Sequence, residues 1–268
     1  SLVLCNGEFG YRLASACPEC IALDFGFARH WEEERILELL DSKPEIDRII
    51  GVCCETSSGM VNDIAMLNRI CEARGIWFAL DAVSALGVES GFCSCPALAM
   101  ATGSSGKALA GVPGIAILLL NPRFPRSVSE VQPKILQLEP LLSAREMPGM
   151  VRNTMSSLLL AALEASCRSI LELGQDHYRR RLLALKDAVR LCLADFGVKA
   201  LAGSDSPIVT AFHRPEPEVW RSWLRSLDEK GVEIYHRVCY LEQRNLFEIA
   251  AMGDWQEEFH RIPDLLQL

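Results

Sequence analysis

The chain has 268 residues and a formal net charge of −8; 50% of its residues are hydrophobic and 23% are charged. A chain of this length can bury one large core and a smaller second one, and its balance of residue types is that of an ordinary globular protein. The acidic charge argues against a nucleic-acid groove, which needs clustered lysine and arginine. The sequence has neither an apolar run of membrane-spanning length nor a signal-peptide pattern at its start, so we expect a cytoplasmic protein.

Apolar runs of strand length alternate with amphipathic helical stretches through the first half of the chain. The expected strands are Leu2–Leu4, Ile21–Phe25, Arg48–Cys54, Ile76–Leu80, Ala97–Ala101 and Ile115–Leu120. Helical periodicity covers Arg35–Leu40 and Val61–Arg74. Short apolar strands separated by amphipathic helices indicate an α/β fold, with a mainly parallel sheet covered by helices on both faces.

The second half has a different organisation. A connector punctuated by proline runs from Asn121 to Pro148, and a long helical pattern follows from about Thr154 to Phe196, interrupted near Gly174. The remainder combines two short strands with one helix, expected at Ile208–Phe212, Val232–Tyr235 and Val219–Glu229. We therefore predict a large α/β domain over residues 1–140 and a smaller α+β domain over residues 141–268.

The eleven cysteines do not form a recognisable disulfide framework or metal site. Cys17 and Cys20 make a CxxC, but the sequence lacks the second CxxC or histidine pair that a zinc site needs. The motif also falls at the end of a helical stretch, whereas a thioredoxin-like centre opens a helix. We expect reduced, mostly buried thiols and no metal site.

Polar residues follow three consecutive predicted strands: Glu55 to Gly59, then Asp81, then Ser104 to Lys107. The ligands of parallel sheets bind at the carboxyl ends of the strands, so we expect these loops to form one site. Asp81 and Lys107 match what pyridoxal phosphate (PLP) chemistry requires. The lysine amine holds the cofactor as a Schiff base, and the carboxylate keeps the pyridine nitrogen protonated. Taken singly, each is more simply a strand-terminal aspartate or a surface lysine.

Five stretches match one enzyme family in its order and at about its spacing: Asn6–Arg12, Leu23–Gly26, Cys54–Met60, Asp81–Ser84 and Ser104–Gly114. Weaker echoes continue at Ser206–Thr210, Gly231–Tyr235 and Met252–Asp254. Through these motifs the chain resembles the class V aminotransferases of fold type I, and among them the 2-aminoethylphosphonate:pyruvate aminotransferases. The resemblance implies a fold type I PLP-transferase with pyridoxal 5'-phosphate as cofactor and no metal.

The resemblance also implies roles for single residues. Phe9 is expected to stack on the pyridine ring, although core packing is the plainer alternative. The hydroxyl of Thr56 could reach the phenolic oxygen of the cofactor or the substrate, although a polar turn would look the same. The remaining cofactor-binding residues are Asp81, Ser104, Ser105, Lys107 and Thr154. Among these, Ser104 and Ser105 are expected at the phosphate, Lys107 carries the proton transfer as well, and Thr154 reaches the phosphate of a partner subunit. A homodimer follows from that last role.

Three departures from the family weaken these expectations. The family's Gly-Ser-Gly-Thr phosphate loop, which lies at a helix N-terminus, would fall upstream of Ser1, so the N-terminal part of the family fold is expected to be missing. Glu248 aligns with the arginine that binds the substrate's acid group, and a carboxylate cannot replace it. Arg244 is the candidate substitute. Met155-Ser156-Ser157 stands where a proline-rich turn is expected.

Two functions remain open at this point. The first is a PLP-dependent aminotransferase that moves an amino group from 2-aminoethylphosphonate, or a similar small amine, to pyruvate, giving phosphonoacetaldehyde and alanine. Its partners would be the amine and the 2-oxo acid, with no nucleic acid or membrane. The alternative is a truncated or degenerate aminotransferase-like protein without catalytic activity, favoured by the missing phosphate loop and by Glu248. A cysteine desulfurase is disfavoured because Gly106, not histidine, precedes Lys107.

Overall fold

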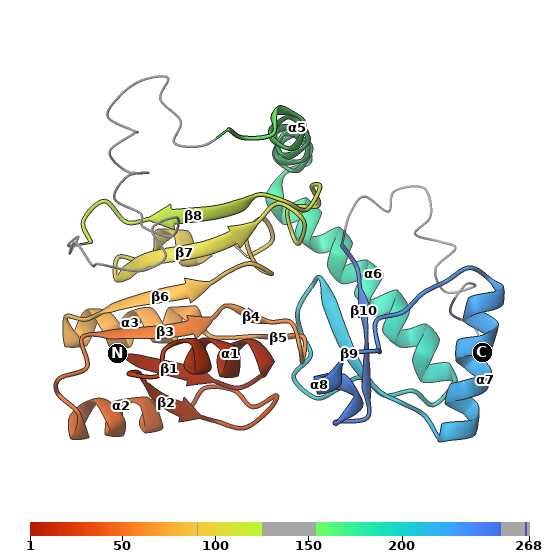
Figure 1. Cartoon of the computed structure of the whole chain (residues 1–268), viewed down its shortest axis with the longest axis horizontal. Coiled ribbons are helices and arrows are strands. Elements are labelled where there is room, and N and C mark those ends of the chain that lie inside the picture. Colours follow the sequence, from red (N-terminus) through yellow and green to blue (C-terminus); the bar gives the residue numbers. More distant parts are fainter. Residues whose placement is uncertain (90, 125–153, 253–265, 267–268) are drawn as a thin grey trace.

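The computed structural model describes residues 1–89, 91–124, 154–252 and 266. A large α/β part and a smaller C-terminal part are joined by a pair of long helices (Figure 1). None of the helices in these ranges is long and apolar enough to span a membrane. The predicted boundary between residues 140 and 141 lies outside the described residues.

The large part is built on one six-stranded sheet in the order β2-β1-β3-β6-β7-β8. Its strands, taken along the chain, are β1 (Leu2–Cys5), β2 (Ile21–Asp24), β3 (Arg48–Val52), β6 (Trp77–Asp81), β7 (Leu98–Ser104) and β8 (Ala116–Leu120). Neighbouring strands are parallel except β8, which runs antiparallel to β7. The mainly parallel α/β sheet expected from the sequence is therefore confirmed. A short hairpin of β4 (Cys54–Glu55) and β5 (Met60–Val61) follows β3.

Helices cover both faces of this sheet. Helix α1 (Glu8–Ala16) lies on one face, and α2 (Glu33–Ser42) and α3 (Ile64–Arg74) lie on the other (Figure 1), as right-handed crossovers in opposite directions require. A short 3₁₀ helix, η1 (Gly91–Ser94), follows β6. Helix α3 has clear local signals. Asp63 caps its start by accepting a hydrogen bond from the Met66 amide at 2.8 Å, and Gly75 ends it in a left-handed conformation with φ 64°.

The second half of the chain begins with two helices, α5 (Ser157–Leu173) and α6 (Gln175–Asp195). The expected interruption is confirmed at Gly174, where the backbone turns with a φ of 85°. The C-terminal part then places α7 (Pro217–Glu229) and α8 (Cys239–Glu242) around an antiparallel pair, β9 (Val209–His213) and β10 (Leu246–Ala250). The strand expected over Val232–Tyr235 is reduced to one antiparallel bridge, in which Tyr235 pairs with Glu248 on the edge of β10 that β9 leaves open.

The oxidation state of the cysteines differs from the expectation at one pair. Cys17 and Cys20 form a disulfide just after α1, so the expectation of reduced thiols is wrong for this pair. Cys5, Cys53 and Cys54 are free and buried, as is Cys71. Across the described part of the chain, we find no group of three or more metal-ligating side chains placed to hold an ion.

Helices α5 and α6 fix the loop that follows the last parallel strand. The Tyr178 hydroxyl of α6 donates to the Ala108 carbonyl at 3.1 Å, and the Ser166 hydroxyl of α5 donates to the Leu109 carbonyl. Ala108 and Leu109 are buried in one cluster with Leu182 of α6. The segment that carries Lys107 is thus held between the sheet and the helices that lead to the C-terminal part.

The C-terminal core depends on an aromatic cluster centred on Phe247. Its side chain is fully buried and lies 5.3 Å from the Phe212 ring, 5.0 Å from Trp220 and 5.2 Å from Trp223. We expect Phe247→Ala to lower the free energy of unfolding by about 3–5 kcal/mol, because it removes a large side chain and leaves a cavity.

Urea unfolding of the full chain measures this loss. Leu191→Ala is the matched control, since that side chain of α6 is 70% exposed and its truncation should change stability by less than about 0.5 kcal/mol. Equal effects of the two substitutions would contradict the assignment of this core.

Candidate active site

The residues singled out in the sequence lie at one edge of the sheet. Strands β1, β3, β6 and β7 are adjacent and parallel, so their carboxyl ends lie side by side. The register aligns Val52 with Asp81 and Asp81 with Thr102, two residues before the end of β7. Asp81 ends β6 at this edge, and Phe9, Thr56 and Lys107 follow the ends of β1, β3 and β7 there.

Lys107 lies in a tight turn directly after β7. The Gly106 amide donates to the Ser104 hydroxyl at 3.3 Å, and the Ala110 amide donates to the Lys107 carbonyl at 2.9 Å. A Cβ atom on Gly106 would lie 2.6 Å from the Cγ of Pro113, which is too close for any other residue to fit without movement. This packing explains why small residues precede the lysine.

Ser105 has a structural role in that turn. Its hydroxyl is fully buried; it donates to the Val112 carbonyl at 2.7 Å and accepts from the Ile115 amide at 3.1 Å. A hydroxyl has only one proton to donate, so Ser105 cannot also donate to a phosphate oxygen without opening the turn. The phosphate role expected for Ser104 stays a prediction.

Asp81 ends β6 and is only half-buried. Its Oδ1 accepts a hydrogen bond from the Val83 amide at 2.9 Å. Burial raises the pKa of its carboxyl, while that hydrogen bond and the positive charge of Lys107 both lower it. The carboxylate therefore lies within electrostatic reach of the lysine, as the proposed pair requires.

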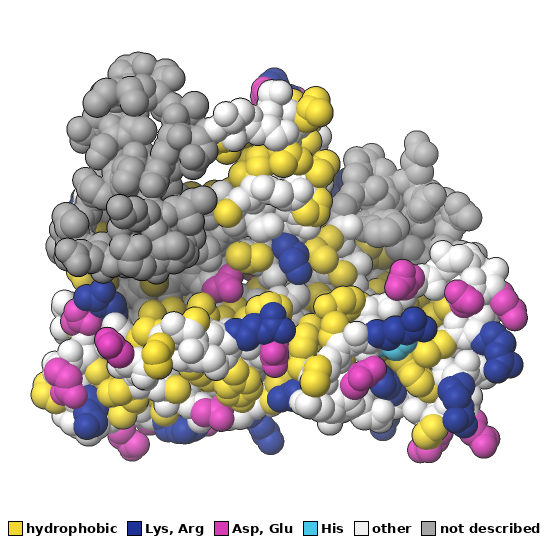
Figure 2. Space-filling model, in the orientation of Figure 1, with side chains coloured by type: hydrophobic (Ala, Val, Ile, Leu, Met, Phe, Trp, Pro, Cys, Tyr) yellow, Lys and Arg dark blue, Asp and Glu magenta, His cyan; other side chains and the backbone are white. Residues whose placement is uncertain are grey.

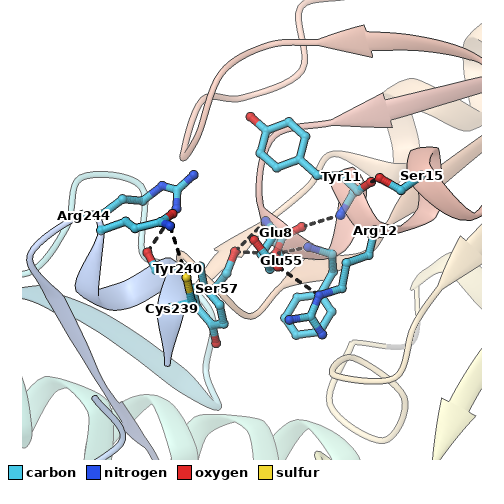
Figure 3. A network of polar contacts seen from close by, with 12 residues as sticks. Glu8, Tyr11, Arg12, Ser15, Glu55, Ser57, Cys239, Tyr240 and Arg244 are labelled. Carbon is cyan, nitrogen blue, oxygen red and sulfur yellow. Dashed lines mark hydrogen bonds and ion pairs between the residues drawn. The ribbon is translucent and has the colours of Figure 1, made fainter. Parts of the chain in front are cut away.

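Sequence reasoning missed a role for Glu55. This side chain is fully buried and accepts hydrogen bonds from the Phe9 amide at 3.2 Å, the Gly10 amide at 3.1 Å and the Ser57 hydroxyl at 2.6 Å (Figure 3). It occupies the N-terminus of α1, where free amides and the helix dipole favour an anion. A Cβ on Gly7 would lie 2.2 Å from the Cγ of Glu55, so only glycine permits this approach.

Two further predicted residues lie beside this helix start. The Thr56 hydroxyl is buried and lies 2.9 Å from that of Ser84, which follows Asp81 on its loop. Phe9 belongs to the first turn of α1, and its ring lies 5.2 Å from the Arg12 guanidinium carbon. Thr154 is exposed and directly follows residues outside the described ranges, so the structure of this single chain leaves its expected contact with a partner untested.

Glu248 reaches the same region from the C-terminal part. The residue is 4% exposed, and its Oε1 has no hydrogen-bond partner among the described residues. Burial raises the pKa of its carboxyl to about 8, the positive charge of Lys107 opposes that shift, and the negative charge of Glu55 adds to it. The positive charge of Lys107 therefore acts on the Glu248 carboxyl, although the two residues are far apart in sequence.

Arg244, the candidate substitute for the missing arginine, contacts Tyr240 and Phe27 in this structure. Its Nη1 donates to the Tyr240 carbonyl at 3.0 Å, and its guanidinium carbon lies 4.2 Å from the centre of the Phe27 ring. Figure 3 shows it on the C-terminal side of the junction, across from Glu55 and Ser57. The guanidinium group of Arg244 therefore makes a cation–π contact with Phe27.

The arrangement fits one end of a PLP molecule better than the other. A carboxylate, a lysine amine, a hydroxyl pair and an aromatic ring on neighbouring loops are the groups that a pyridine aldehyde needs. Donors for a phosphate are sparser, since Ser105 is committed to its turn and Glu55 with Ser57 occupies the α1 amides.

Comparison with known proteins agrees with this geometry. The 2-aminoethylphosphonate–pyruvate transaminase of Pseudomonas aeruginosa strain UCBPP-PA14 is 27% identical over 268 residues, covering 94% of this chain and 70% of the relative. The enzyme of the same name from Syntrophobacter fumaroxidans is 25% identical, covering 97% and 73%. No protein-family model matches the chain.

The solved structures show the same fold. Alanine–glyoxylate aminotransferase from a Nostoc species superposes with a TM-score of 0.87 at 19% identity, covering 99% of this chain and 74% of that one. Pyridoxamine–pyruvate aminotransferase from Mesorhizobium loti gives 0.81 at 20% identity, covering 99% and 71%. The chain is related to the class V aminotransferases. Its fold is that of the fold type I PLP-dependent aminotransferases, so both expectations are confirmed.

The buried carboxyl of Glu248 gives a prediction for stability. Its pKa lies near 8 in the folded chain, against an ordinary value of 4.5 for the unfolded one. Between these values the folded state binds the extra proton, so the free energy of unfolding should fall as pH rises, by up to about 1.4 kcal/mol per pH unit. Glu248→Gln should remove this part of the slope.

Urea unfolding at a series of pH values from about 5 to 8 measures the slope. Glu242→Gln, which makes the same change on an exposed side chain of α8, should keep the slope of the unmodified chain. Parallel slopes for Glu248→Gln and the unmodified chain would mean that Glu248 ionises normally.

Proposed function

We propose that this chain transfers an amino group from a small amine to a 2-oxo acid with PLP as cofactor. The observation that carries the proposal is the position of Lys107, which follows β7 and lies within electrostatic reach of Asp81 at the end of the neighbouring β6. In the net reaction the donor carbon loses its nitrogen and becomes an aldehyde or ketone. The 2-oxo acid gains that nitrogen and becomes an amino acid.

Each described residue then has a stated task. When bound, PLP supplies a carbonyl that takes up the amino group and a ring that accepts electrons. Asp81 would keep the ring nitrogen protonated, and Phe9 would cover one face of the ring. Thr56, hydrogen-bonded with Ser84, would orient the phenolic oxygen. Lys107 would bind the cofactor's carbonyl carbon and, once displaced by the donor amine, carry a proton between the donor carbon and the cofactor.

The names of the relatives suggest the first substrates to test. Proteins named 2-aminoethylphosphonate–pyruvate transaminase match 94% or more of this chain. We accordingly propose 2-aminoethylphosphonate and pyruvate as the starting pair, with phosphonoacetaldehyde and alanine as products.

We also propose that the enzyme acts as a homodimer in which Thr154 reaches the partner's phosphate site. Helix α5, which begins close to Thr154, exposes apolar side chains over a continuous area in the space-filling view (Figure 2). Leu158 is 80% exposed and Leu171 is 77% exposed. An exposed apolar face of this kind is typical of a surface that another protein covers.

The alternative is that this chain is an aminotransferase-like protein without catalytic activity, and Glu248 favours that alternative. The buried carboxyl of Glu248 offers no positive charge to the acid group of a substrate. The Ser105 hydroxyl already donates its proton to the Val112 carbonyl, so it is not available to a phosphate oxygen. A chain with these features could fold and assemble without catalysing transfer.

Borohydride reduction in the presence of PLP separates the two functions. If Lys107 binds the cofactor, reduction should fix one cofactor mass on the peptide that contains Lys107. Lys107→Ala should abolish this labelling, whereas Lys199→Ala, on an exposed side chain, should not. Labelling that is spread over surface lysines and unaffected by Lys107→Ala would contradict the proposal.

The same preparation tests Asp81. Asp81→Asn keeps the size of the side chain and removes its charge, so the labelling of Lys107 should persist while amino transfer slows. We expect a loss of about 100-fold or more, each tenfold corresponding to about 1.4 kcal/mol. Unchanged transfer rates would remove Asp81 from the mechanism.

A further inference from the structure

The disulfide between Cys17 and Cys20 lies at the surface of the large part of the chain. Nine other cysteines are free, and four of them are buried. Cys17 and Cys20 are each partly exposed, and Pro18 and Glu19 between them are exposed. A dissolved thiol can therefore reach this bond while the chain stays folded, which is the first requirement for thiol–disulfide exchange.

The bond contributes little to the stability of the fold as a whole. It joins residues only three positions apart, and the stabilisation by a disulfide grows with the length of chain that it closes. The turn that it closes also has a hydrogen bond of its own, from the Cys20 amide to the Cys17 carbonyl at 2.9 Å. An exposed disulfide that the fold does not need is typical of bonds that are made and broken in use.

The position of the pair on its helix distinguishes it from the catalytic CxxC of a disulfide oxidoreductase. Such enzymes place the motif at a helix N-terminus, where the free amides stabilise a thiolate. Cys17 instead follows the last residue of α1, and its amide donates to the Ala14 carbonyl at 3.2 Å. The carbonyl end of a helix disfavours a thiolate. The pair is therefore suited to be reduced by another dithiol and not to reduce other proteins.

The disulfide fixes the end of a helix that has little else to hold it. Helix α1 has nine residues, of which only Gly10 is buried, and helices of this length are marginal by themselves. Glu55 holds its first turn through the amides of Phe9 and Gly10. The disulfide ties the other end to Cys20, which directly precedes β2. Breaking the bond therefore leaves the second half of α1 with weaker anchorage.

That second half contacts the residue expected to stack on the cofactor. The Arg12 guanidinium carbon lies 5.2 Å from the centre of the Phe9 ring. One residue earlier, the Tyr11 hydroxyl donates to Asp24 at the end of β2, at 2.9 Å. Tyr11 and Arg12 are both drawn on this helix in Figure 3. A looser second half of α1 would release Arg12 from Phe9 and leave that ring less firmly placed.

We propose that Cys17 and Cys20 form a reversible dithiol–disulfide site, and that its reduction by a dithiol loosens the second half of α1. A thiolate of the reductant bonds to one sulfur, the bond between the cysteines breaks, and the other sulfur leaves with the electron pair and takes up a proton. The second thiol of the reductant then displaces the first sulfur, so two cysteine thiols form and the reductant becomes a disulfide. This exchange needs neither PLP nor Lys107, and only its consequence for Phe9 rests on the proposed function.

Alkylation of the folded full chain, read by peptide mass spectrometry, tests the exchange. Dithiothreitol without denaturant should add two alkyl groups to the peptide that contains Cys17 and Cys20. Oxidised glutathione should then restore the bond, so that the peptide loses both alkyl groups and gains no glutathione. Cys93 and Cys239 are exposed and free, so their alkylation before any treatment is the internal reference. Reduction that requires urea, or thiols that oxidised glutathione does not join, would overturn the proposal.

Hydrogen exchange on the same samples tests the effect on the helix. Reduction should speed exchange of the amides of Tyr11–Ala16 by about tenfold or more and leave those of α3 unchanged. A double variant, Cys17→Ser with Cys20→Ser, should show the fast exchange with or without dithiothreitol, whereas Cys239→Ser should respond like the unmodified chain. Equal exchange in the reduced and oxidised chains would contradict the proposal. Failure of borohydride to label Lys107 would remove the aminotransferase function and leave these expected results unchanged.

Discussion

The electrostatic interaction of one lysine with two acids, which come from different parts of the chain, is the interaction on which this site depends. Lys107 acts on Asp81 from the neighbouring strand end and on Glu248 from the C-terminal sheet. Both carboxyls are drawn out of water, which raises their pKa values, and the lysine offsets part of that cost for each. The large sheet, the turn after β7 and strand β10 must therefore keep their relative positions for the site to exist.

The rest of the architecture serves those positions. The turn of Lys107 is closed by Ser105 and by the close contact of Gly106 with Pro113, and it is held from outside by Tyr178 and Ser166 of the long helices. Glu55 fixes the start of α1 and thereby Phe9. Its carboxylate also contributes the negative charge next to Glu248. The contact that orders the helix therefore makes the site more acidic.

Local signals in the sequence predicted much of this fold. Apolar runs of strand length predicted the six strands of the sheet, and helical periodicity with Gly174 predicted the division between α5 and α6. The loops at the strand ends were placed correctly because parallel strands oblige their carboxyl ends to meet. The antiparallel direction of β8 and the loss of a strand at Val232–Tyr235 depend on partners distant in sequence, and no local pattern carries that information.

The electrostatic character of the site was harder to predict. Glu248 could be noticed as an acid in place of an arginine, but its burial and the effect of the Lys107 charge on its pKa arise only when the two halves pack. Ser105 looked like a phosphate ligand because hydroxyls beside a lysine suggest one, whereas its proton is used within the turn. Glu55 gave one faint signal, namely a glycine at the start of a helix where a larger residue would collide with it.

A double-mutant cycle between Lys107 and Glu248 tests the central claim most directly. The free energy of unfolding would be measured for the unmodified chain, Lys107→Met, Glu248→Gln and the double variant, at a pH of about 9 where Glu248 is ionised. If the charges of Lys107 and Glu248 attract each other, the two substitutions should show a coupling free energy of about 1 kcal/mol or more. Additivity within about 0.5 kcal/mol would show that the lysine and the acid do not interact, and the account of the site would be wrong.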